Sequence, residues 1–395
     1  MTDTQAREAE LYMQAARRLP VTLVRGAGAR VWDDEGKEYL DFVAGIASCT
    51  FGHSDPGLAG IIAEQARTLI HVSNIFYTEP QIELAELLIE HSAMDRVFFA
   101  NSGAEANEAA LKLARKWGRL NRNGAHEIIV AQNGFHGRTM ATVAATGTPA
   151  YREPFEPLVP GFEYVDFDDV EAIQSATNER TAAVMLEPIQ GEGGINVPAD
   201  GYLRAVREWC DEQGMLLILD EVQVGMGRTG TLWAHEQAGI IPDIMTSAKA
   251  LGGGVPIGAM MSTEAASVFE PGDHGSTFGG QPLATAAAAH VLRRVIEGDT
   301  LANVRARGEQ AASRLAALGE KHDVVRGVRG RGLLIGLELN DAIAPQVVVE
   351  SVQRGILLNP VRPDVVRMMP PLNVTAEEID QAVDIIDGAI AEVTG

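Results

Sequence analysis

One stretch of the chain, Met215-Leu-Leu-Ile-Leu-Asp-Glu-Val-Gln223, joins five apolar residues directly to a carboxylate. Unbroken apolarity of this length predicts a strand that is covered on both faces, as in a parallel sheet. Asp220, at the end of that strand, would be costly to bury without a cation beside it. The stretch therefore predicts an α/β fold that holds an ionised group at a strand end, although Asp220 could instead cap the following turn.

Further apolar runs extend this pattern along the chain. We expect strands at 97–100, 128–131, 183–186, 216–219 and 257–261, and helices between them, for example at 104–117 and 201–213. This alternation predicts a mostly parallel sheet with helices on its faces. From about residue 283 the pattern changes to two long helices (283–296 and 301–318), a strand-like region at 324–339 and a last helix that begins after Thr375.

Three parts of the chain are expected from this change of pattern. Residues 53–285 should form a large domain that contains Asp220, and residues 286–395 a smaller α+β domain at the C-terminal end. The N-terminal segment, residues 1–52, reads as short strands and turns and is expected to join the smaller domain.

Composition narrows the class of protein. The chain has 395 residues, 46% of them hydrophobic, and a formal net charge of −22. Such a charge repels nucleic acids and acidic membranes, and no apolar run approaches the roughly 20 residues that span a bilayer. The polar first residues fit no targeting signal, two cysteines are too few for a disulfide framework, and no histidines show zinc-site spacing. We expect a cytoplasmic enzyme with no metal, nucleic acid or membrane partner.

Lys249 is the second residue that points to chemistry. It lies between small and apolar residues, just ahead of Gly252-Gly-Gly254. Burial would depress the pKa of such an amine, so that it can hold an aldehyde as a Schiff base. Asp220 could then keep a pyridine nitrogen protonated, with Gln223 hydrogen-bonded to a ring hydroxyl. Together these residues indicate pyridoxal 5'-phosphate as the cofactor.

Two further strand ends carry residues suited to that cofactor. Ser102, Gly103 and Ala104 open a helix, where free N–H groups and the helix dipole favour a phosphate. Ser102 and Glu105 also have the spacing of an ordinary capping box. After the strand at 128–131, Phe135 could stack on a pyridine ring or lie in the core.

Charged and hydroxyl groups complete the candidate site. Arg138 offers a fork for a carboxylate, or it could be a solvated surface group. Glu192, flanked by glycines, could face the same crevice or the solvent. The stretch Gly275-Ser-Thr-Phe-Gly-Gly280 could supply a further phosphate contact or be a simple loop.

Five segments in this order resemble the class III aminotransferases, a family of fold-type I pyridoxal phosphate enzymes. They are Ser102-Gly-Ala-Glu-Ala-Asn-Glu108, Phe135-His-Gly-Arg-Thr139, Leu219-Asp-Glu-Val-Gln223, Ala248-Lys-Ala-Leu-Gly252 and Gly275-Ser-Thr-Phe-Gly-Gly280. The resemblance covers nearly the whole chain. The stretches 46–51 and 368–371 depart from the commonest wording of the family and bear on substrate choice, not on the cofactor.

The resemblance implies a role for each candidate residue. The cofactor would be bound by Ser102, Gly103, Ala104, Phe135, Asp220, Val222, Gln223 and Lys249, with Lys249 and Asp220 as the catalytic pair. Ser276 and Thr277 would reach the site from the partner subunit, Thr277 to bind the cofactor and Ser276 the substrate, which implies a homodimer with shared active sites. Arg138 would bind the carboxylate of an acylated substrate and Arg367 the α-carboxylate of glutamate, with Glu192 pairing Arg367 when the donor lacks that group.

Within the family, the chain is most similar to the members that move the δ-amino group of N2-acetylornithine to 2-oxoglutarate. The products are N-acetylglutamate 5-semialdehyde and glutamate, a step of arginine biosynthesis. Ornithine, succinylornithine, 4-aminobutyrate and carrier-bound substrates of a lysine pathway remain as alternatives. So do an aminomutase of the same fold and, from another class, a non-catalytic protein that binds the cofactor.

Overall fold

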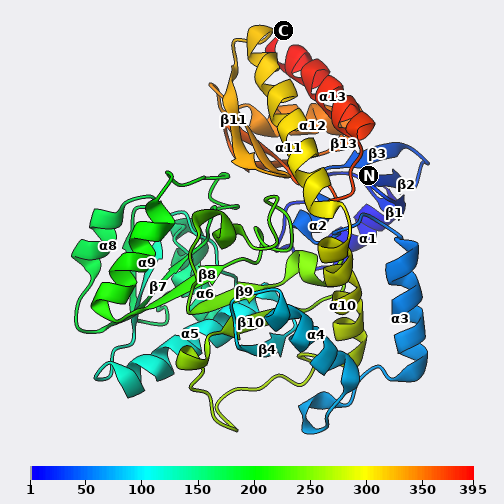
Figure 1. The fold of residues 1–395 in the computed structure, drawn as a ribbon. Coiled ribbons are helices and arrows are strands. Elements are labelled where there is room, and N and C mark those ends of the chain that lie inside the picture. Colours follow the sequence, from blue (N-terminus) through cyan, green and yellow to red (C-terminus); the bar gives the residue numbers. More distant parts are fainter. Residues whose placement is uncertain (1) are drawn as a thin grey trace.

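The computed structural model describes residues 2–395 and centres on a seven-stranded sheet (Figure 1). Five neighbouring strands run parallel, and β10 pairs antiparallel with both β9 and β4. The mostly parallel α/β sheet predicted from the apolar runs is therefore confirmed. In spatial order the strands are β4 (Arg96–Ala100), β10 (Gly258–Ser262), β9 (Ile244–Ser247), β8 (Leu216–Asp220), β7 (Thr181–Leu186), β5 (Glu127–Ala131) and β6 (Phe162–Val165).

Both faces of this sheet are covered, which explains why its strands are apolar without alternation. On β5, Ile128 and Val130 face a cluster with α5 (Gly103–Asn121). Ile129 and Ala131 face a second cluster, with α8 (Val170–Ala176) and α9 (Tyr202–Gln213). Successive side chains of a strand point to opposite faces, so an apolar residue is needed at every position.

Strands β6 and β9 were not predicted. Both have only four residues, and β9 ends in Thr246 and Ser247, so neither shows a long apolar run. The other predicted strands and helices of this part are present with slightly different ends. Helix α9 ends at Gly214, which adopts φ 60°, a conformation that glycine reaches without a Cβ penalty.

Two four-stranded sheets form the rest of the fold. One has the order β1 (Leu23–Ala27), β2 (Arg30–Asp33), β3 (Glu38–Asp41) and β13 (Ile356–Leu357), so strands from both ends of the chain pair in it. The other has the order β11 (Val325–Arg331), β12 (Leu334–Leu339), β15 (Val365–Met368) and β14 (Asn359–Arg362). Strand β3 pairs parallel with β13, so the N-terminal segment contacts the C-terminal part of the chain. The division into domains, with boundaries at residues 52 and 285, stays a prediction.

Figure 1 shows α11 (Thr300–Ala316), α12 (Ala344–Gln353) and α13 (Ala376–Thr394) above the large sheet. Helix α13 begins with the capping box expected at Thr375 and Glu378. Helix α10 (Pro282–Glu297) leads from the lower part to the upper one. The remaining helices are α1 (Asp3–Leu11), α2 (Ala44–Ala47), α3 (Pro56–Thr68), α4 (Glu79–Glu90), α6 (Met140–Ala145) and α7 (Pro149–Arg152).

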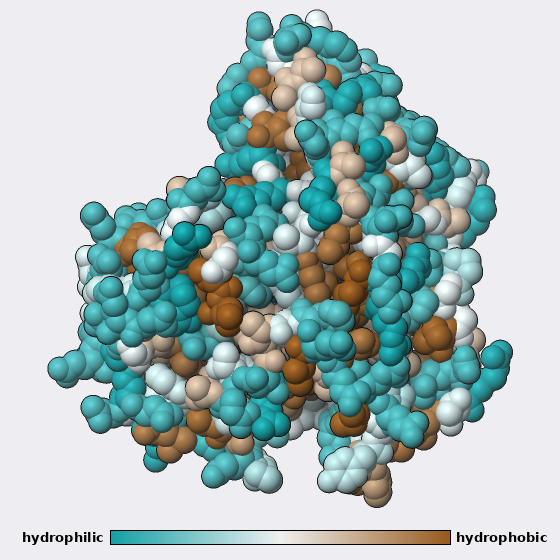
Figure 2. All heavy atoms as spheres, in the orientation of Figure 1, coloured by the Kyte–Doolittle hydropathy of each residue, from teal (hydrophilic) through white to brown (hydrophobic). Residues whose placement is uncertain are grey.

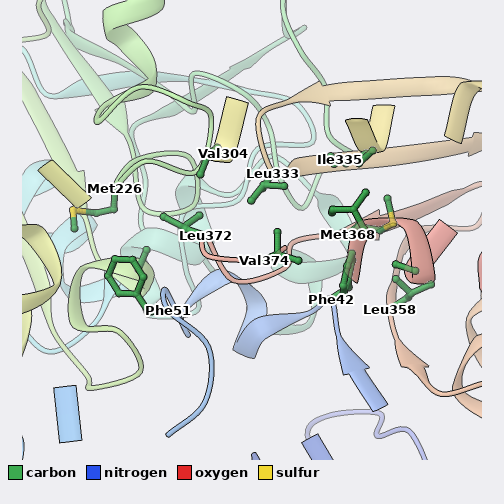
Figure 3. Packing of buried hydrophobic residues seen from close by; sticks show 14 of the residues in the cluster. Phe42, Phe51, Met226, Val304, Leu333, Ile335, Leu358, Met368, Leu372 and Val374 are labelled. Carbon is green, nitrogen blue, oxygen red and sulfur yellow. The ribbon is translucent and has the colours of Figure 1, made fainter. Parts of the chain in front are cut away.

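A hydrophobic cluster joins segments that are far apart in the sequence. Figure 3 labels Phe51, Met226, Val304, Leu333 and Leu372 among the members of this cluster. All five are at least 95% buried. Polar side chains cover most of the face drawn in Figure 2, with apolar patches between them. Among residues 2–395, every helix is too short or too polar to cross a membrane.

Candidate active site

A cavity of about 430 Å³ lies at the carboxyl ends of β4, β5, β7, β8 and β9. Parallel strands present their carboxyl ends at one edge of a sheet, which is where α/β proteins bind ligands. Ten of the predicted site residues line this cavity: Ser102, Gly103, Ala104, Phe135, Arg138, Glu192, Asp220, Val222, Gln223 and Lys249. Ser48, from the stretch that departs from the family wording, also lines it.

Asp220 is the anion at the base of the cavity and is only 4% exposed. Its Oδ2 accepts hydrogen bonds from the Asn107 side chain and lies 2.8 Å from His136 Nδ1. Its Oδ1 accepts the Val222 N–H. Burial disfavours the charged form of His136, but Asp220 outweighs it, so the pKa of His136 is raised. Contacts with Asn107, His136 and Val222 therefore fix the position of the Asp220 carboxylate.

Sequence reasoning missed His136 and Asn107 as partners of Asp220. His136 directly follows Phe135 within a motif that was selected, and Asn107 lies one turn into α5, where its Oδ1 accepts the Thr246 hydroxyl at 2.7 Å. Only the fold reveals these contacts, because the three segments are brought together by neighbouring strands.

Lys249 directly follows Ala248 at the end of β9 and has φ 35°, a left-handed conformation that is unfavourable for a lysine. Strain of this kind concentrates at functional sites. Burial lowers the pKa of the Lys249 amine, and Glu192 and Asp220 only partly oppose this. The backbone thus holds the amine in the cavity, and the lowered pKa favours the neutral, nucleophilic form.

The N-terminus of α5 forms another wall. The Glu105 N–H donates to Ser102 Oγ at 3.2 Å, so the ordinary capping interaction is present. The other first-turn N–H groups of this 19-residue helix have no intrahelical acceptor. A Cβ on residue 103 would lie 2.7 Å from Val222 Cγ1. Glycine is therefore required there for the helix start to approach the segment after Asp220.

Phe135 and Arg138 lie on the segment after β5. The Phe135 ring packs edge-on against Tyr151, with 6.0 Å between centroids. Arg138 is exposed, and its guanidinium lies 3.7 Å from the centroid of the Tyr151 ring. Phe135 is only partly buried and lines the cavity, which distinguishes it from a core aromatic.

Glu187 anchors the Phe135 segment through hydrogen bonds to backbone N–H groups. Its Oε1 accepts the Phe135 N–H at 2.9 Å, and its Oε2 accepts the Gly191 N–H at 3.1 Å. Burial raises the pKa of Glu187 to about 7, despite these bonds and nearby His136. Its position directly after β7 was a signal, but sequence alone could not show that this carboxyl is buried.

Glu192, Gln223 and Arg367 form a connected group. Arg367 is 1% exposed, and its Nη1 lies 2.6 Å from Glu192 Oε1 and 3.2 Å from Gln223 Oε1. Burial raises the pKa of Glu192, but Arg367 and Lys249 outweigh it, so the pKa is lowered. The other terminal nitrogen of Arg367 donates to Asn359. Arg367 does not line the cavity, whereas Glu192 lines it and contacts Arg367.

Ser276 and Thr277 lie on the loop before α10 and do not line the cavity. The Asn101 side chain donates to Ser276 Oγ at 3.0 Å, and Thr277 is exposed. Within one chain, these two predicted residues are therefore not brought together with the others.

The residues of the cavity suit pyridoxal 5'-phosphate. A buried amine, a hydrogen-bonded carboxylate, a partly exposed aromatic ring and a helix N-terminus match its aldehyde, pyridine nitrogen, ring face and phosphate respectively. Because residue 103 is a glycine, no side chain covers the backbone N–H groups at the start of α5, where a phosphate could bind. Fold and site together define a fold-type I enzyme that uses this cofactor.

Comparison with known proteins gives the family. A sequence model described as aminotransferase class-III matches residues 11–390. Two curated relatives described as acetylornithine aminotransferase are each 52% identical. For the protein from Thermosynechococcus vestitus, the alignment covers 97% of this chain and 96% of the relative. For the protein from Gloeobacter violaceus, it covers 100% of this chain and 98% of the relative. The chain belongs to the class III aminotransferases, and pyridoxal 5'-phosphate is the cofactor of that family.

Solved structures agree with this assignment. The ornithine aminotransferase of Toxoplasma gondii has a TM-score of 0.96 at 37% identity, with 99% of this chain and 95% of that chain covered. The N-acetylornithine aminotransferase of Stenotrophomonas maltophilia has a TM-score of 0.85 at 40% identity, with 98% and 99% covered.

Proposed function

We propose that this aminotransferase moves the δ-amino group of N2-acetylornithine to 2-oxoglutarate, giving N-acetylglutamate 5-semialdehyde and glutamate. The observation that carries the proposal is the pairing of Arg367 with Glu192, in a cavity that the exposed Arg138 also lines. The carbon that bears a δ-amine carries no carboxylate. Glu192 supplies a carboxylate to Arg367 in its place. The names of the curated relatives support the acylated substrate.

The chain's own groups can then be given roles. The bound cofactor supplies an aldehyde and an electron-accepting ring. Arg138 binds the remote carboxylate of the acylated substrate through charged hydrogen bonds. Lys249 Nζ would hold the cofactor's aldehyde and could move a proton at the substrate carbon, a general acid–base role that contributes roughly 10²–10⁴-fold. Asp220 would hold the protonated ring nitrogen, and Phe135 would lie beside the ring.

In the second half of the reaction the substrate is 2-oxoglutarate, which leaves as glutamate. Its α-carboxylate would displace Glu192 from Arg367, because both carboxylates compete for one guanidinium edge. The chain can thus accept donors with and without a carboxylate at the reacting carbon.

A panel of amine donors tests the substrate. N2-acetylornithine, ornithine, N2-succinylornithine and 4-aminobutyrate are each reacted with the holoenzyme, and half-reaction spectra are compared with steady-state rates in the presence of 2-oxoglutarate. N2-acetylornithine should give the highest kcat/KM. A higher value for ornithine, the substrate class named for the Toxoplasma gondii relative, would contradict the proposal. Turnover without 2-oxoglutarate would indicate an aminomutase instead.

We also propose a homodimer with shared active sites in the cytoplasm. Ile75, Phe76 and Tyr77 are 64–100% exposed, and contiguous exposed apolar groups mark interaction surfaces. The neighbouring Asn74 donates to the backbone of Ser276 and Gly279, so this apolar segment supports the loop that carries Ser276 and Thr277. Dimer formation would bring that loop to the partner's cavity. Light scattering of Tyr77→Glu, which should lower the dimer fraction, tests this arrangement.

A further inference from the structure

Arg228 is a buried arginine outside the cavity. It is 0% exposed and lies eight residues after Asp220 on the same connecting segment. Its Nη1 donates to the backbone oxygens of Leu333 at 3.1 Å and Pro370 at 2.6 Å. The Leu333 N–H in turn donates to the Arg228 backbone oxygen at 3.0 Å. Arg228 therefore joins the segment after Asp220 to the β11–β12 turn and to the residues after β15.

This arginine has no acidic partner. Among residues 2–395 no carboxylate lies within ion-pair distance of it, and its Nε and Nη2 have no hydrogen-bond acceptor. Met226 nearby in the chain, its hydrogen-bond partner Leu333, and Leu372, which a Cβ on residue 227 would approach to 3.3 Å, all belong to the hydrophobic cluster of Figure 3. Burial lowers the pKa of Arg228 to about 9, so it stays protonated at neutral pH.

A charge buried without a counter-ion opposes folding, and an apolar side chain of similar size often packs in its place at no loss of stability. Stability therefore does not explain why an arginine occupies this position. The segments that Arg228 joins suggest a role in the geometry of the site. Pro370 comes three residues after Arg367, whereas Asp220 and Gln223 lie on the segment that carries Arg228 itself.

We infer that Arg228 is a positioning residue, which fixes the end of β15, and with it Arg367, relative to Asp220 and Gln223. One nitrogen joins the carbonyl groups of two separate segments to the segment that carries Asp220 and Gln223, in addition to the backbone bond between Leu333 and Arg228. The inference rests on the proposed role of Arg367 as the group that binds the α-carboxylate of glutamate. Through Arg367, Arg228 would affect the binding of glutamate and 2-oxoglutarate. It would affect much less the binding of a donor that Arg138 holds.

Three variants separate positioning from general stability. Arg228→Met removes the charge and both hydrogen bonds but keeps an apolar side chain of similar length. Arg228→Lys keeps the charge, although its nitrogen reaches about one bond less far. Val304→Ala is the control, because Val304 is fully buried in the same cluster but lies away from the cavity.

For each holoenzyme we would measure the melting temperature, the Kd of glutarate by calorimetry, and the KM of glutamate and of N2-acetylornithine. Glutarate is a dicarboxylate probe that binds without reaction. In Arg228→Met, the glutarate Kd and glutamate KM should rise about tenfold, a loss typical of a displaced binding group, while the KM of N2-acetylornithine changes less than about twofold. Arg228→Lys should recover part of this loss. Val304→Ala should lower the melting temperature and leave both KM values unchanged.

A double variant shows whether Arg228 acts through Arg367. In an Arg367→Ala background, Arg228→Met should cause no further rise in the glutarate Kd, because coupled residues are not additive. An additive rise, equal losses for both substrates, or the same pattern in Val304→Ala would overturn the inference. If Arg228→Met does not fold, the same comparisons are made with Arg228→Lys. Failure of the wild type to react with N2-acetylornithine would reject the proposed substrate, and the glutarate titrations would still decide the role of Arg228.

Discussion

Arg138 and Tyr151 form a stacked pair at the mouth of the cavity, with the guanidinium carbon 3.7 Å from the ring centroid. Tyr151 lies on α7 and also packs edge-on against Phe135. Phe135 and Arg138 thus both pack against the ring of Tyr151. Since Arg138 is exposed, this contact limits the orientations that its side chain can adopt.

Arg138→Ala should weaken binding of N2-acetylornithine by about 1.5–3 kcal/mol, the value of a charged hydrogen-bonded contact. Tyr151→Leu, which leaves Arg138 unsupported, should cost roughly 0.5–1 kcal/mol through loss of the cation–π contact at an exposed site. The KM values of N2-acetylornithine and glutamate, compared for both variants, measure these effects. Equal losses for the two substrates would contradict the assignment of Arg138 to the acylated substrate.

The chain offers a matched control for Tyr151. Arg152, the next residue on α7, stacks on Tyr164 at 3.8 Å, a similar contact outside the cavity lining. Arg152→Ala should leave both KM values unchanged. A change in Arg152→Ala as large as that in Tyr151→Leu would show that α7 is merely destabilised.

Lys249→Ala should abolish the visible absorbance of the cofactor bound through that lysine and reduce turnover by at least the 10²–10⁴-fold expected for a lost acid–base group. The phosphate contacts predicted at α5 would not involve Lys249, so dialysed protein should retain the cofactor without the covalent bond. Absorption spectra and cofactor content after dialysis check both statements. An unchanged spectrum would show that another amine holds the cofactor.

Much of the fold followed from local patterns. The continuous apolar runs of β5, β7 and β8 predicted a doubly covered sheet because burial on both faces leaves no alternation. Strand β9 escaped notice, since four residues that include Thr246 and Ser247 show no such run. The sheet, not the sequence of β9, makes it a strand, because its neighbours β8 and β10 supply its hydrogen bonds.

Some residues of the candidate site could be predicted from the sequence, but the contacts between them could not. Residues at strand ends, such as Asp220 and Lys249, could be selected because their polarity is costly in an apolar context. Contacts between segments could not be predicted. His136 beside Asp220 and the double acceptor role of Glu187 depend on neighbouring strands, and Arg228 depends on packing between both parts of the fold.

Glu192→Gln should tighten glutamate binding. Glutamate must displace Glu192 from Arg367, and a neutral amide forms a weaker bond to a guanidinium than a carboxylate by about 1–2 kcal/mol. The glutamate KM should therefore fall by roughly 5- to 30-fold at that difference. The KM of N2-acetylornithine should rise, because Arg367 then lacks its counter-charge when this donor is bound. Half-reaction titrations with both substrates measure the two changes, and a fall in both KM values would contradict competition for Arg367.

Glu187→Gln should change how stability depends on pH. The pKa of Glu187 is raised from 4.5 to about 7 by burial, so the folded protein binds this proton more tightly than the unfolded chain. The resulting stability is present below pH 4.5 and is lost as pH rises through 7, by up to ~3 kcal/mol at 1.36 kcal/mol per pH unit. The raised pKa of His136 acts in the same direction.

A glutamine at 187 cannot titrate, and it accepts only one of the N–H groups of Phe135 and Gly191. The variant should therefore be less stable than the wild type at pH 5 by about 1–3 kcal/mol, the cost of an unpaired buried donor. The gap should narrow, or reverse, by pH 8, because the variant lacks the loss of stability that comes from Glu187, whereas the contribution of His136 is present in both proteins. Urea unfolding at pH 5, 6, 7 and 8 gives the difference, with exposed Glu171→Gln as a control that should show no pH-dependent gap. A difference that stays constant from pH 5 to 8 would mean that Glu187 is already ionised at pH 5, and that the Phe135 segment rests on a charged carboxylate.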